Sequence, residues 1–278
     1  MTGVMVQLRF LEKARCELGL RVLSSIVLAT ITVALVLLGG WWFAGLVLIL
    51  ALIVVHEWFA MSGCAGRWAA MAAIVGVWFA MAVHGSLYLA LYMAVFGAIG
   101  TAMFSLVSRG GEGGPWAAAG TIYAALPMAA LLWMRAEEGS QWLLLWMFLV
   151  VWSSDTGAYI VGRLVGGMKL APKISPGKTV SGAVGGLTLA SIVAMTLASM
   201  IPSDEIRGLI LGAVVAIAAQ AGDLLQSAIK RRYGVKDSGS IIPGHGGVMD
   251  RLDSLVLAAP ALAVAVVIVS TLMGAPHG

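Results

Sequence analysis

Charged residues are scarce in this chain of 278 residues: Asp, Glu, Lys and Arg together make up 11% of it. A soluble globular domain carries about 25% charged and about 45–50% apolar residues, whereas this chain is 60% hydrophobic. Its two cysteines, Cys16 and Cys64, stand in no C-x-x-C or zinc-ligand spacing. These shortages exclude a disulfide framework, a disordered chain and a soluble nucleotide-binding enzyme, and they indicate an integral membrane protein.

The sequence contains long uncharged stretches. About 20 consecutive apolar residues are enough to cross a membrane as a helix. The stretches 22–55 and 68–108 each predict a pair of helices, with breaks near residues 39–42 and 84–85. Five further spans are expected, near residues 116–134, 141–163, 180–201, 206–229 and 252–274. The predicted fold is therefore an all-α integral membrane protein with about nine transmembrane helices.

Basic residues set the expected orientation, because cytoplasmic loops carry an excess of Lys and Arg. With a cytoplasmic N-terminus and an external C-terminus, every Lys and Arg except Arg135 and Arg207 falls on the inside. The net charge of +4 is then explained by topology, and no nucleic-acid partner is expected. We expect residues 1–135 to form a scaffold and oligomerisation region. Residues 136–278 are expected to form the catalytic region, with cytoplasmic loops at 163–179 and 230–251.

One expected helix carries a polar face in the second half of the chain. Gln220, Asp223, Ser227 and Lys230 recur with the 3.6-residue period of a helix, among Ala, Leu and Ile. A carboxylate in an apolar span must pair with a cation, bind a metal or stay protonated. Asp223 is therefore either a metal ligand or the ion-pair partner of Lys230 or Arg251.

The segment after this helix combines glycines, basic residues and carboxylates. The glycine-rich run 243–247 lets the backbone approach an anion and point its amides at it. Asp250 and Asp253 stand three residues apart before the last span, and we expect them to face the same way. Carboxylates beside basic side chains are typical of a site where Mg²⁺ meets phosphates.

The loop 163–179 is a third polar segment. Its Gly-Lys-Thr at 177–179 resembles the end of a P-loop, but Pro172 stands where the first glycine belongs, so that match fails. Ser175, Lys178 and Thr179 remain candidates for holding a phosphate. The alternative interpretation is a plain cytoplasmic basic loop.

The region 227–253 resembles the signature of phosphatidate cytidylyltransferases, also called CDP-diacylglycerol synthases. The matching residues are Ser-Ala-Ile-Lys-Arg at 227–231, Lys-Asp-Ser-Gly at 236–239, Pro-Gly-His-Gly-Gly at 243–247 and Asp-Arg-Leu-Asp at 250–253. Residues 155–159, 170–179 and 222–224, with Glu57 and Trp58, resemble the same family in the same order. One departure is Gln226, where many relatives carry an acid.

The resemblance implies an enzyme of phospholipid biosynthesis that condenses CTP with phosphatidic acid to CDP-diacylglycerol and pyrophosphate. It implies Mg²⁺, with a second cation left open, and a homodimer of all-helical protomers among membrane lipids. It also implies a multi-pass protein of the cell (inner) membrane whose active site faces the cytoplasm. Two alternatives stay open: a CTP-dependent lipid kinase of the polyprenol type, and a transporter of anionic lipids. Transporters often contain inverted repeats, and none is visible here.

In the expected mechanism a phosphatidate oxygen attacks the α-phosphorus of CTP, so the protein positions the substrates and neutralises charge. The metal candidates are Asp155, Asp223, Asp250 and Asp253. The catalytic candidates are Asp223, Lys230, His245, Asp250 and Arg251, with His245 either an acid or base or a hydrogen-bonding group. The substrate-binding candidates are Ser175, Lys178, Thr179, Ser227, Arg231, Lys236, Asp237, Gly244, Gly246 and Gly247.

Overall fold

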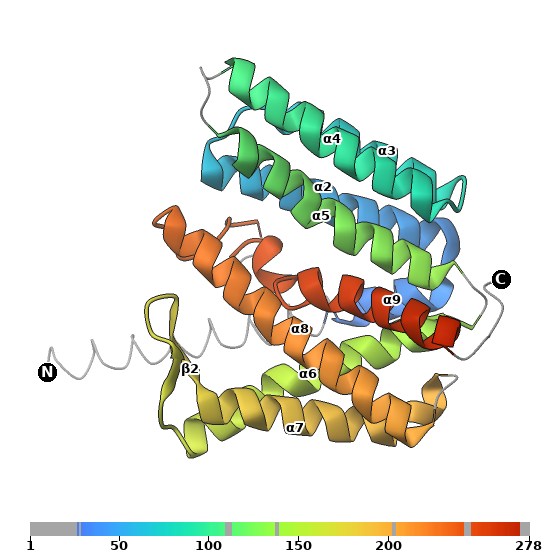
Figure 1. Ribbon diagram of the computed structural model, residues 1–278, viewed down its shortest axis with the longest axis vertical. Coiled ribbons are helices and arrows are strands. Elements are labelled where there is room, and N and C mark those ends of the chain that lie inside the picture. The colour runs from blue at the N-terminus through green and yellow to red at the C-terminus, as the bar shows by residue number, and fades with distance from the viewer. Residues whose placement is uncertain are drawn as a thin grey trace, which may run out of the picture.

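The computed structural model describes residues 27, 29–108, 113–136, 139–201, 204–241 and 246–272. Helices packed side by side dominate this part of the chain (Figure 1). They are a short helix Ala29–Leu38, α2 (Gly40–Ser62), α3 (Arg67–Ala82), α4 (Leu87–Ser108), α5 (Gly114–Arg135), α6 (Gln141–Leu164), α7 (Val180–Thr196), α8 (Glu205–Arg232) and α9 (Leu255–Leu272). Two 3-10 turns, η1 (Ala198–Met200) and η2 (Met249–Arg251), complete the helical elements.

The helices have the length and composition of a membrane protein. Among the described residues, α2, α4, α5, α6 and α8 are long and apolar enough to cross a membrane, and the other helices are apolar but shorter. The expected breaks are confirmed: one helix ends at Leu38 before α2 begins, and α3 ends at Ala82 before α4 begins at Leu87. Gly39 and Gly85 have φ values of 63° and 61° at these breaks, a conformation that glycine adopts at little cost.

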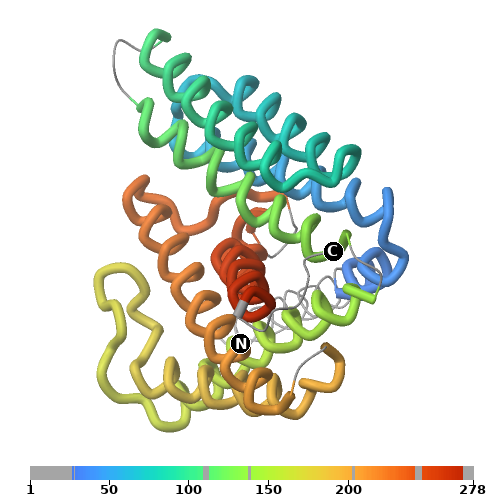
Figure 2. Tube along the Cα trace, turned by 45° about the vertical axis from the view of Figure 1, so that its right-hand side comes forward, coloured from blue at the N-terminus to red at the C-terminus, as the bar shows by residue number. Residues whose placement is uncertain are grey.

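Two groups of helices meet along α9. Helices α2, α3 and α4 pack around α5, while α6 and α7 pack against each other and against α8. Helix α9 contacts α5 on one side and α8 on the other, and Figure 2 shows it between the two groups. The last helix of the described chain therefore joins the N-terminal helices to α6, α7 and α8.

A β hairpin follows α6, which the all-α prediction did not include. Strand β1 (Lys169–Ala171) pairs antiparallel with β2 (Ser175–Thr179), with Lys169 opposite Thr179 and Ala171 opposite Ser175. The two strands contain little of the β-branched and aromatic character that is typical of strands. Their composition therefore gave no signal for a hairpin. The hairpin nevertheless places Lys178 beside α8 and Thr179 at the start of α7.

Small residues bring α6 and α7 close together. A methyl group on Gly186 would lie 2.6 Å from the Ser154 carbonyl oxygen, and one on Gly182 would lie 2.7 Å from the Ala158 carbonyl oxygen. Such glycines allow helix backbones to approach within van der Waals contact in a membrane. The close packing of these two helices fixes the relative positions of the side chains that they present to α8.

Substitution of Gly186 tests this packing. Gly186→Ala should lower the free energy of unfolding by about 1–3 kcal/mol, because the backbone oxygen of Ser154 cannot move aside easily. The matched control is Gly100→Ala in α4, where an added methyl meets nothing within 4 Å. It should be neutral or stabilise the helix by up to about 1 kcal/mol. Thermal unfolding in detergent measures both, and equal effects would contradict the packing argument.

Candidate active site

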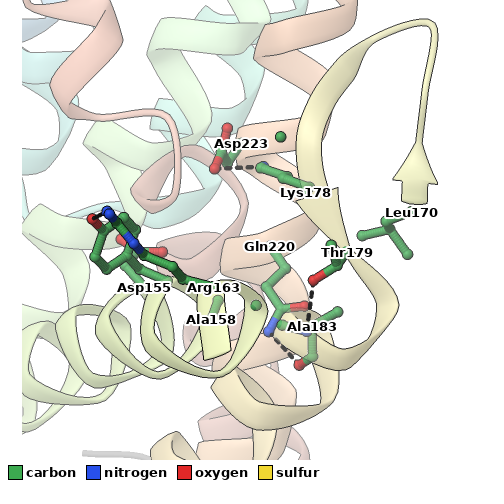
Figure 3. Close-up of a pocket in the computed structure, with 13 residues that line it drawn as sticks. Asp155, Ala158, Arg163, Leu170, Lys178, Thr179, Ala183, Gln220 and Asp223 are labelled. Atoms are coloured by element: carbon green, nitrogen blue, oxygen red, sulfur yellow. Dashed lines mark hydrogen bonds and ion pairs between the residues drawn. The ribbon is translucent and has the colours of Figure 1, made fainter. Parts of the chain in front are cut away.

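A cavity of about 650 Å³ lies between α6, the β hairpin, α7 and α8 (Figure 3). Much of its wall consists of small or apolar residues such as Ala158, Leu170 and Ala183. The polar side chains that line it are Asp155, Tyr159, Arg163, Lys178, Thr179, Gln220 and Asp223. Two of the three polar segments that the sequence indicated, the polar face of α8 and the loop 163–179, therefore line one cavity together with α6, whereas the described part of the loop after α8 does not line it.

Asp223 on α8 is paired with Lys178 of the hairpin. The Lys178 ammonium lies 2.5 Å from Asp223 Oδ2, and Figure 3 shows the two side chains pointing toward one another. Ser227 Oγ lies 3.4 Å from Asp223 Oδ1, one helical turn away. Both partners of the pair remain partly exposed, at 28% and 29% of their side-chain surface. The ion-pair alternative named Lys230 or Arg251, but the cation beside Asp223 is Lys178, because β2 runs past α8.

Thr179 ends the hairpin and caps the next helix. Its Oγ1 accepts a hydrogen bond from the Gly182 amide at 3.1 Å, and its side chain is 6% exposed. Gln220 on α8 donates to the Ala183 carbonyl oxygen at 3.1 Å and so ties α8 to the first turns of α7. These contacts hold β2, and with it Lys178, at the cavity wall.

Arg163 belongs to the cavity, although the sequence indicated it only as a cytoplasmic charge. Its Nη1 donates to the Tyr159 hydroxyl oxygen at 2.7 Å. Asp155, Tyr159 and Arg163 stand four residues apart on α6 and all line the cavity. That spacing places them on one helix face, and it is the sequence signal that could have identified Arg163.

A second polar cluster surrounds Asp250 in η2. Asp250 Oδ1 accepts from Lys230 Nζ at 2.7 Å and from Gln226 Nε2 at 3.0 Å. Oδ2 accepts from the Ser238 amide at 2.8 Å and from the Gly247 amide at 3.0 Å. Burial acts to raise the pKa of Asp250, but the donors from Lys230, Ser238 and Gly247 outweigh it and hold the pKa below its usual value. Asp250 is thus an ionised and fully partnered carboxylate.

Asp250 and Asp253 have different hydrogen-bond partners, and the expectation that they face the same way stays a prediction. The last helix begins at Leu255, so Asp250 lies in the separate turn η2 and Asp253 in the turn that follows. Asp253 Oδ1 accepts from the Ser254 amide at 2.8 Å, and Ser254 Oγ lies 3.5 Å from Asp155 Oδ2. Asp253 is therefore linked through Ser254 to Asp155, whereas Asp250 is hydrogen-bonded to Lys230.

The carboxylates near the cavity repel one another. Burial raises the pKa of Asp253 from 3.8 to about 7, and the negative charges of Asp223 and Asp155 add to the increase. Within the described ranges, no three His, Cys, Asp or Glu side chains converge closely enough to hold a metal ion by themselves. The arrangement is a concentration of negative charge that a cation would relieve.

The remaining predicted residues lie around these two clusters. Arg231 Nε donates to the Ile174 carbonyl oxygen at 3.3 Å and links α8 to the hairpin turn. Ser175 is half-buried, whereas Lys236, Asp237 and Arg251 are exposed. The Gly247 amide is engaged by Asp250 and Gly247 does not line the cavity, while Gly246 adopts a φ of 79°. Gly244 and His245 lie outside the described residues, and the role expected for each stays a prediction.

Comparison with known proteins decides the family. A model described as the cytidylyltransferase family matches residues 19–269, which include both polar clusters. The phosphatidate cytidylyltransferase of Brucella suis is 39% identical over 252 residues, covering 88% of this chain and 92% of the relative. The chain belongs to the phosphatidate cytidylyltransferase family. The enzyme of that name from Rickettsia felis is 44% identical over 157 residues, covering 53% of this chain and 69% of the relative.

Gln226, which the resemblance marks as a departure from many relatives, has surroundings that suit an amide. Gln226 is 0% exposed and lies between two partners from other elements. Its Nε2 donates to Asp250 Oδ1 at 3.0 Å, and the Tyr123 hydroxyl lies 3.4 Å from its Oε1. A carboxylate at this position would bring a second negative charge against Asp250. The amide instead lets this cytidylyltransferase family member keep Asp250 ionised with the single cation Lys230.

The raised pKa of Asp253 predicts a pH-dependent stability. Ionisation of Asp253 lowers the free energy of unfolding, because the folded state holds the proton more tightly than the unfolded state does. The free energy of unfolding is therefore highest below the unfolded-state pKa of 3.8 and falls as the pH rises through about 7. Asp253→Asn should therefore raise the melting temperature at about pH 8 by about 2–4 °C without divalent cations, and change it little at about pH 4. Thermal unfolding at both pH values measures this difference.

The control for this prediction is Glu205→Gln, which removes an exposed acid from the first turn of α8. It should give no gain that grows with pH. An equal effect of Asp253→Asn on the melting temperature at both pH values would show that ionisation of Asp253 does not destabilise the folded protein.

Proposed function

We propose that this chain is a phosphatidate cytidylyltransferase that converts CTP and phosphatidic acid into CDP-diacylglycerol and pyrophosphate in phospholipid biosynthesis. The observation that carries the proposal is a cavity among apolar helices that presents both carboxylates and cations at its wall. A lipid phosphate and a nucleotide triphosphate both need cations, and the apolar wall residues suit the lipid glycerol and acyl chains. The names of the similar proteins from Brucella suis and Rickettsia felis support this substrate pair.

The orientation proposed for the protein is that of an inner-membrane enzyme with its site toward the cytoplasm. Five long apolar helices and four shorter ones within the described chain are compatible with nine spans. Basic residues near the cavity, such as Arg163 and Lys178, support a cytoplasmic position for this end of the bundle. A cytoplasmic N-terminus, an external C-terminus and a homodimer complete the proposal.

Carboxylates of the cavity would hold Mg²⁺. Asp155 and Asp223 offer hard oxygen atoms at the wall, and Asp253 lies within electrostatic reach of both. Mg²⁺ is often bound by one or two carboxylates with substrate phosphates and water as the other ligands, so the lack of a three-carboxylate cluster among the described residues fits this ion. When bound, the ion supplies neutralisation of the charge on the CTP phosphates and the leaving pyrophosphate.

The protein groups then position the two substrates and balance their charge. Lys178 and Arg163 neutralise phosphate oxygens at the wall. A phosphatidate oxygen, ionised near neutral pH, attacks the α-phosphorus of CTP while the bond from that phosphorus to the pyrophosphate oxygen breaks, so no protein nucleophile is needed. Lys230 is held by Asp250 at the edge of the same helix that carries Asp223. Asp250 joins the metal ligands only if a cation replaces the Lys230 ammonium, because donors occupy both of its oxygens.

Product analysis tests the activity. Purified protein with phosphatidic acid, CTP and Mg²⁺ should release pyrophosphate and form a lipid that carries CMP. Asp223→Asn should reduce the rate by about 10²–10³-fold, because a charge that binds the metal or orients Lys178 is lost. Glu205→Gln on the same helix should keep the wild-type rate. Release of CDP would indicate a lipid kinase instead, and the absence of both products would favour a carrier.

Lys178 gives a second test, directed at substrate binding. Lys178→Ala should raise the Michaelis constant for CTP or phosphatidic acid about tenfold, which corresponds to about 1.4 kcal/mol of lost charge interaction. Lys169→Ala is the matched control, because Lys169 is exposed in the same hairpin but does not line the cavity. Unchanged constants in Lys178→Ala, or equal changes in both variants, would remove Lys178 from the binding site.

A further inference from the structure

Glu57 is a buried acid in an otherwise uncharged helix. It lies near the end of α2 and is 2% exposed. Helix α2 (Gly40–Ser62) contains no other Asp, Glu, Lys or Arg. A buried carboxylate is stable only where donors replace the water that it has lost. The expected division of the chain assigned this helix to the scaffold, so the partners of Glu57 decide whether that assignment is complete.

The donors come from the two ends of the loop between α8 and α9. The Val248 amide donates to Glu57 Oε1 at 2.8 Å, and the Met249 amide donates to Oε2 at 2.8 Å. Ser238 Oγ lies 2.9 Å from Oε2. Val248 and Met249 begin the 3-10 turn η2, where backbone amides have no intrahelical partner and favour an acceptor. Glu57 therefore caps the turn that carries Asp250.

Glycines allow the loop to close around this carboxylate. A methyl group on Gly247 would lie 2.4 Å from Glu57 Oε2, and one on Gly239 would lie 2.8 Å from Oε1. Carbon atoms do not approach oxygen atoms this closely without displacement. The shape of the loop on both sides of residues 242–245 is thus matched to the Glu57 side chain.

Glu57 and Asp250 hold the same loop residues. Three consecutive amides serve the two acids: Gly247 donates to Asp250, and the next two donate to Glu57. Ser238 Oγ lies between the two acids, 3.0 Å from Asp250 Oδ2 as well. A displacement of this loop from Glu57 would therefore move Asp250 away from Lys230. The side chain of Glu57 reaches the site through backbone amides and does not line the cavity.

We propose that Glu57 is a positioning residue for the reaction: it fixes η2 so that Asp250 holds Lys230 in its working position. This inference rests on the proposed function, because the reaction defines what that position serves. It also assigns an active-site role to the N-terminal helices, which supply the acid that the loop of the C-terminal half folds around.

Glu57→Gln tests the role with a side chain of the same shape. Its amide group can accept at one atom only, so its NH₂ would face a backbone N–H or the Ser238 hydroxyl. We expect the turnover number to fall about 10–100-fold, as for a misplaced catalytic group. The Michaelis constant for phosphatidic acid should change less than about threefold, because the cavity wall is untouched.

Hydrogen exchange reports the loop directly. In Glu57→Gln at least one of the amides of Val248 and Met249 should exchange about tenfold faster than in the wild type, since it loses its acceptor and faces the NH₂ group. Amides in the middle of α4 should exchange at the wild-type rate. Unchanged exchange at residues 248 and 249 would overturn the proposal.

Trp58→Phe is the matched control for stability. Trp58 is the next residue of α2, is 1% exposed, and donates through Nε1 to the Trp116 carbonyl oxygen at 3.0 Å. Its replacement weakens the packing of α2 on α5 without removing a contact to the loop. Trp58→Phe should lower the melting temperature yet keep the turnover number within about twofold below that temperature. A loss of turnover in Trp58→Phe as large as in Glu57→Gln would reduce Glu57 to a stabilising residue.

The outcomes separate this inference from the proposed function. A wild-type protein that releases no pyrophosphate contradicts the proposed function itself. An active wild type with a fully active, folded Glu57→Gln contradicts only the positioning role. If Glu57→Gln does not fold, Glu57→Asp and Ser238→Ala take its place: the first withdraws the carboxylate by one methylene and the second removes one donor. Wild-type turnover numbers in both would overturn the inference.

Discussion

A carboxylate among apolar helices has to be surrounded by donors or by cations, and this requirement organises the second half of the molecule. Glu57 obtains its donors from the loop after α8, through the Ser238 side chain and the amides of residues 248 and 249. Asp250 accepts from amides of the same loop and also from Lys230 and Gln226 on α8. Asp223 obtains a cation from the hairpin. Each acid thereby connects elements that are far apart in the sequence, so the charges that the membrane environment makes costly also define the tertiary structure around the site.

The two clusters differ in how completely their acids are partnered. Asp250 is 6% exposed at its side chain and has donors on both oxygens, whereas Asp223 is 29% exposed and lines the cavity. Interactions at partly exposed groups exchange readily with solvent and ligands, while buried networks hold a fixed geometry. The division therefore suits a site in which the cluster around Asp250 is rigid and the cavity around Asp223 receives substrate.

Sequence periodicity predicted the helices and the polar face of α8, because a 3.6-residue repeat is a local property. The helix breaks near residues 39 and 85 followed from glycines in the same way. The pairing of charges did not follow from the sequence: Asp223 meets Lys178 and Lys230 meets Asp250. These pairs depend on where the hairpin and η2 are placed against α8, which is set by tertiary packing.

The contacts of Glu57 could not be predicted from the sequence either. The sequence placed it in a family pattern, but its partners are up to 192 positions away, and they include backbone amides that no residue pattern reveals. Arg163 differs, since its spacing from Asp155 and Tyr159 on α6 was available. Local spacing could therefore have added Arg163 to the predicted cavity residues. The hydrogen bonds between Glu57 and the loop after α8 depend on the tertiary structure and could not be read from residue spacing.

The position of α9 between the two helix groups has a consequence for biosynthesis. Since α9 and the turn before it follow the other described helices in chain order, α2 is synthesised long before Val248 and Met249 exist. During that interval Glu57 lacks the three donors that surround it in the folded protein. Assembly of the cluster around Glu57 and Asp250 thus comes late in the synthesis of the described part of the chain, and α9 then packs between α5 and α8.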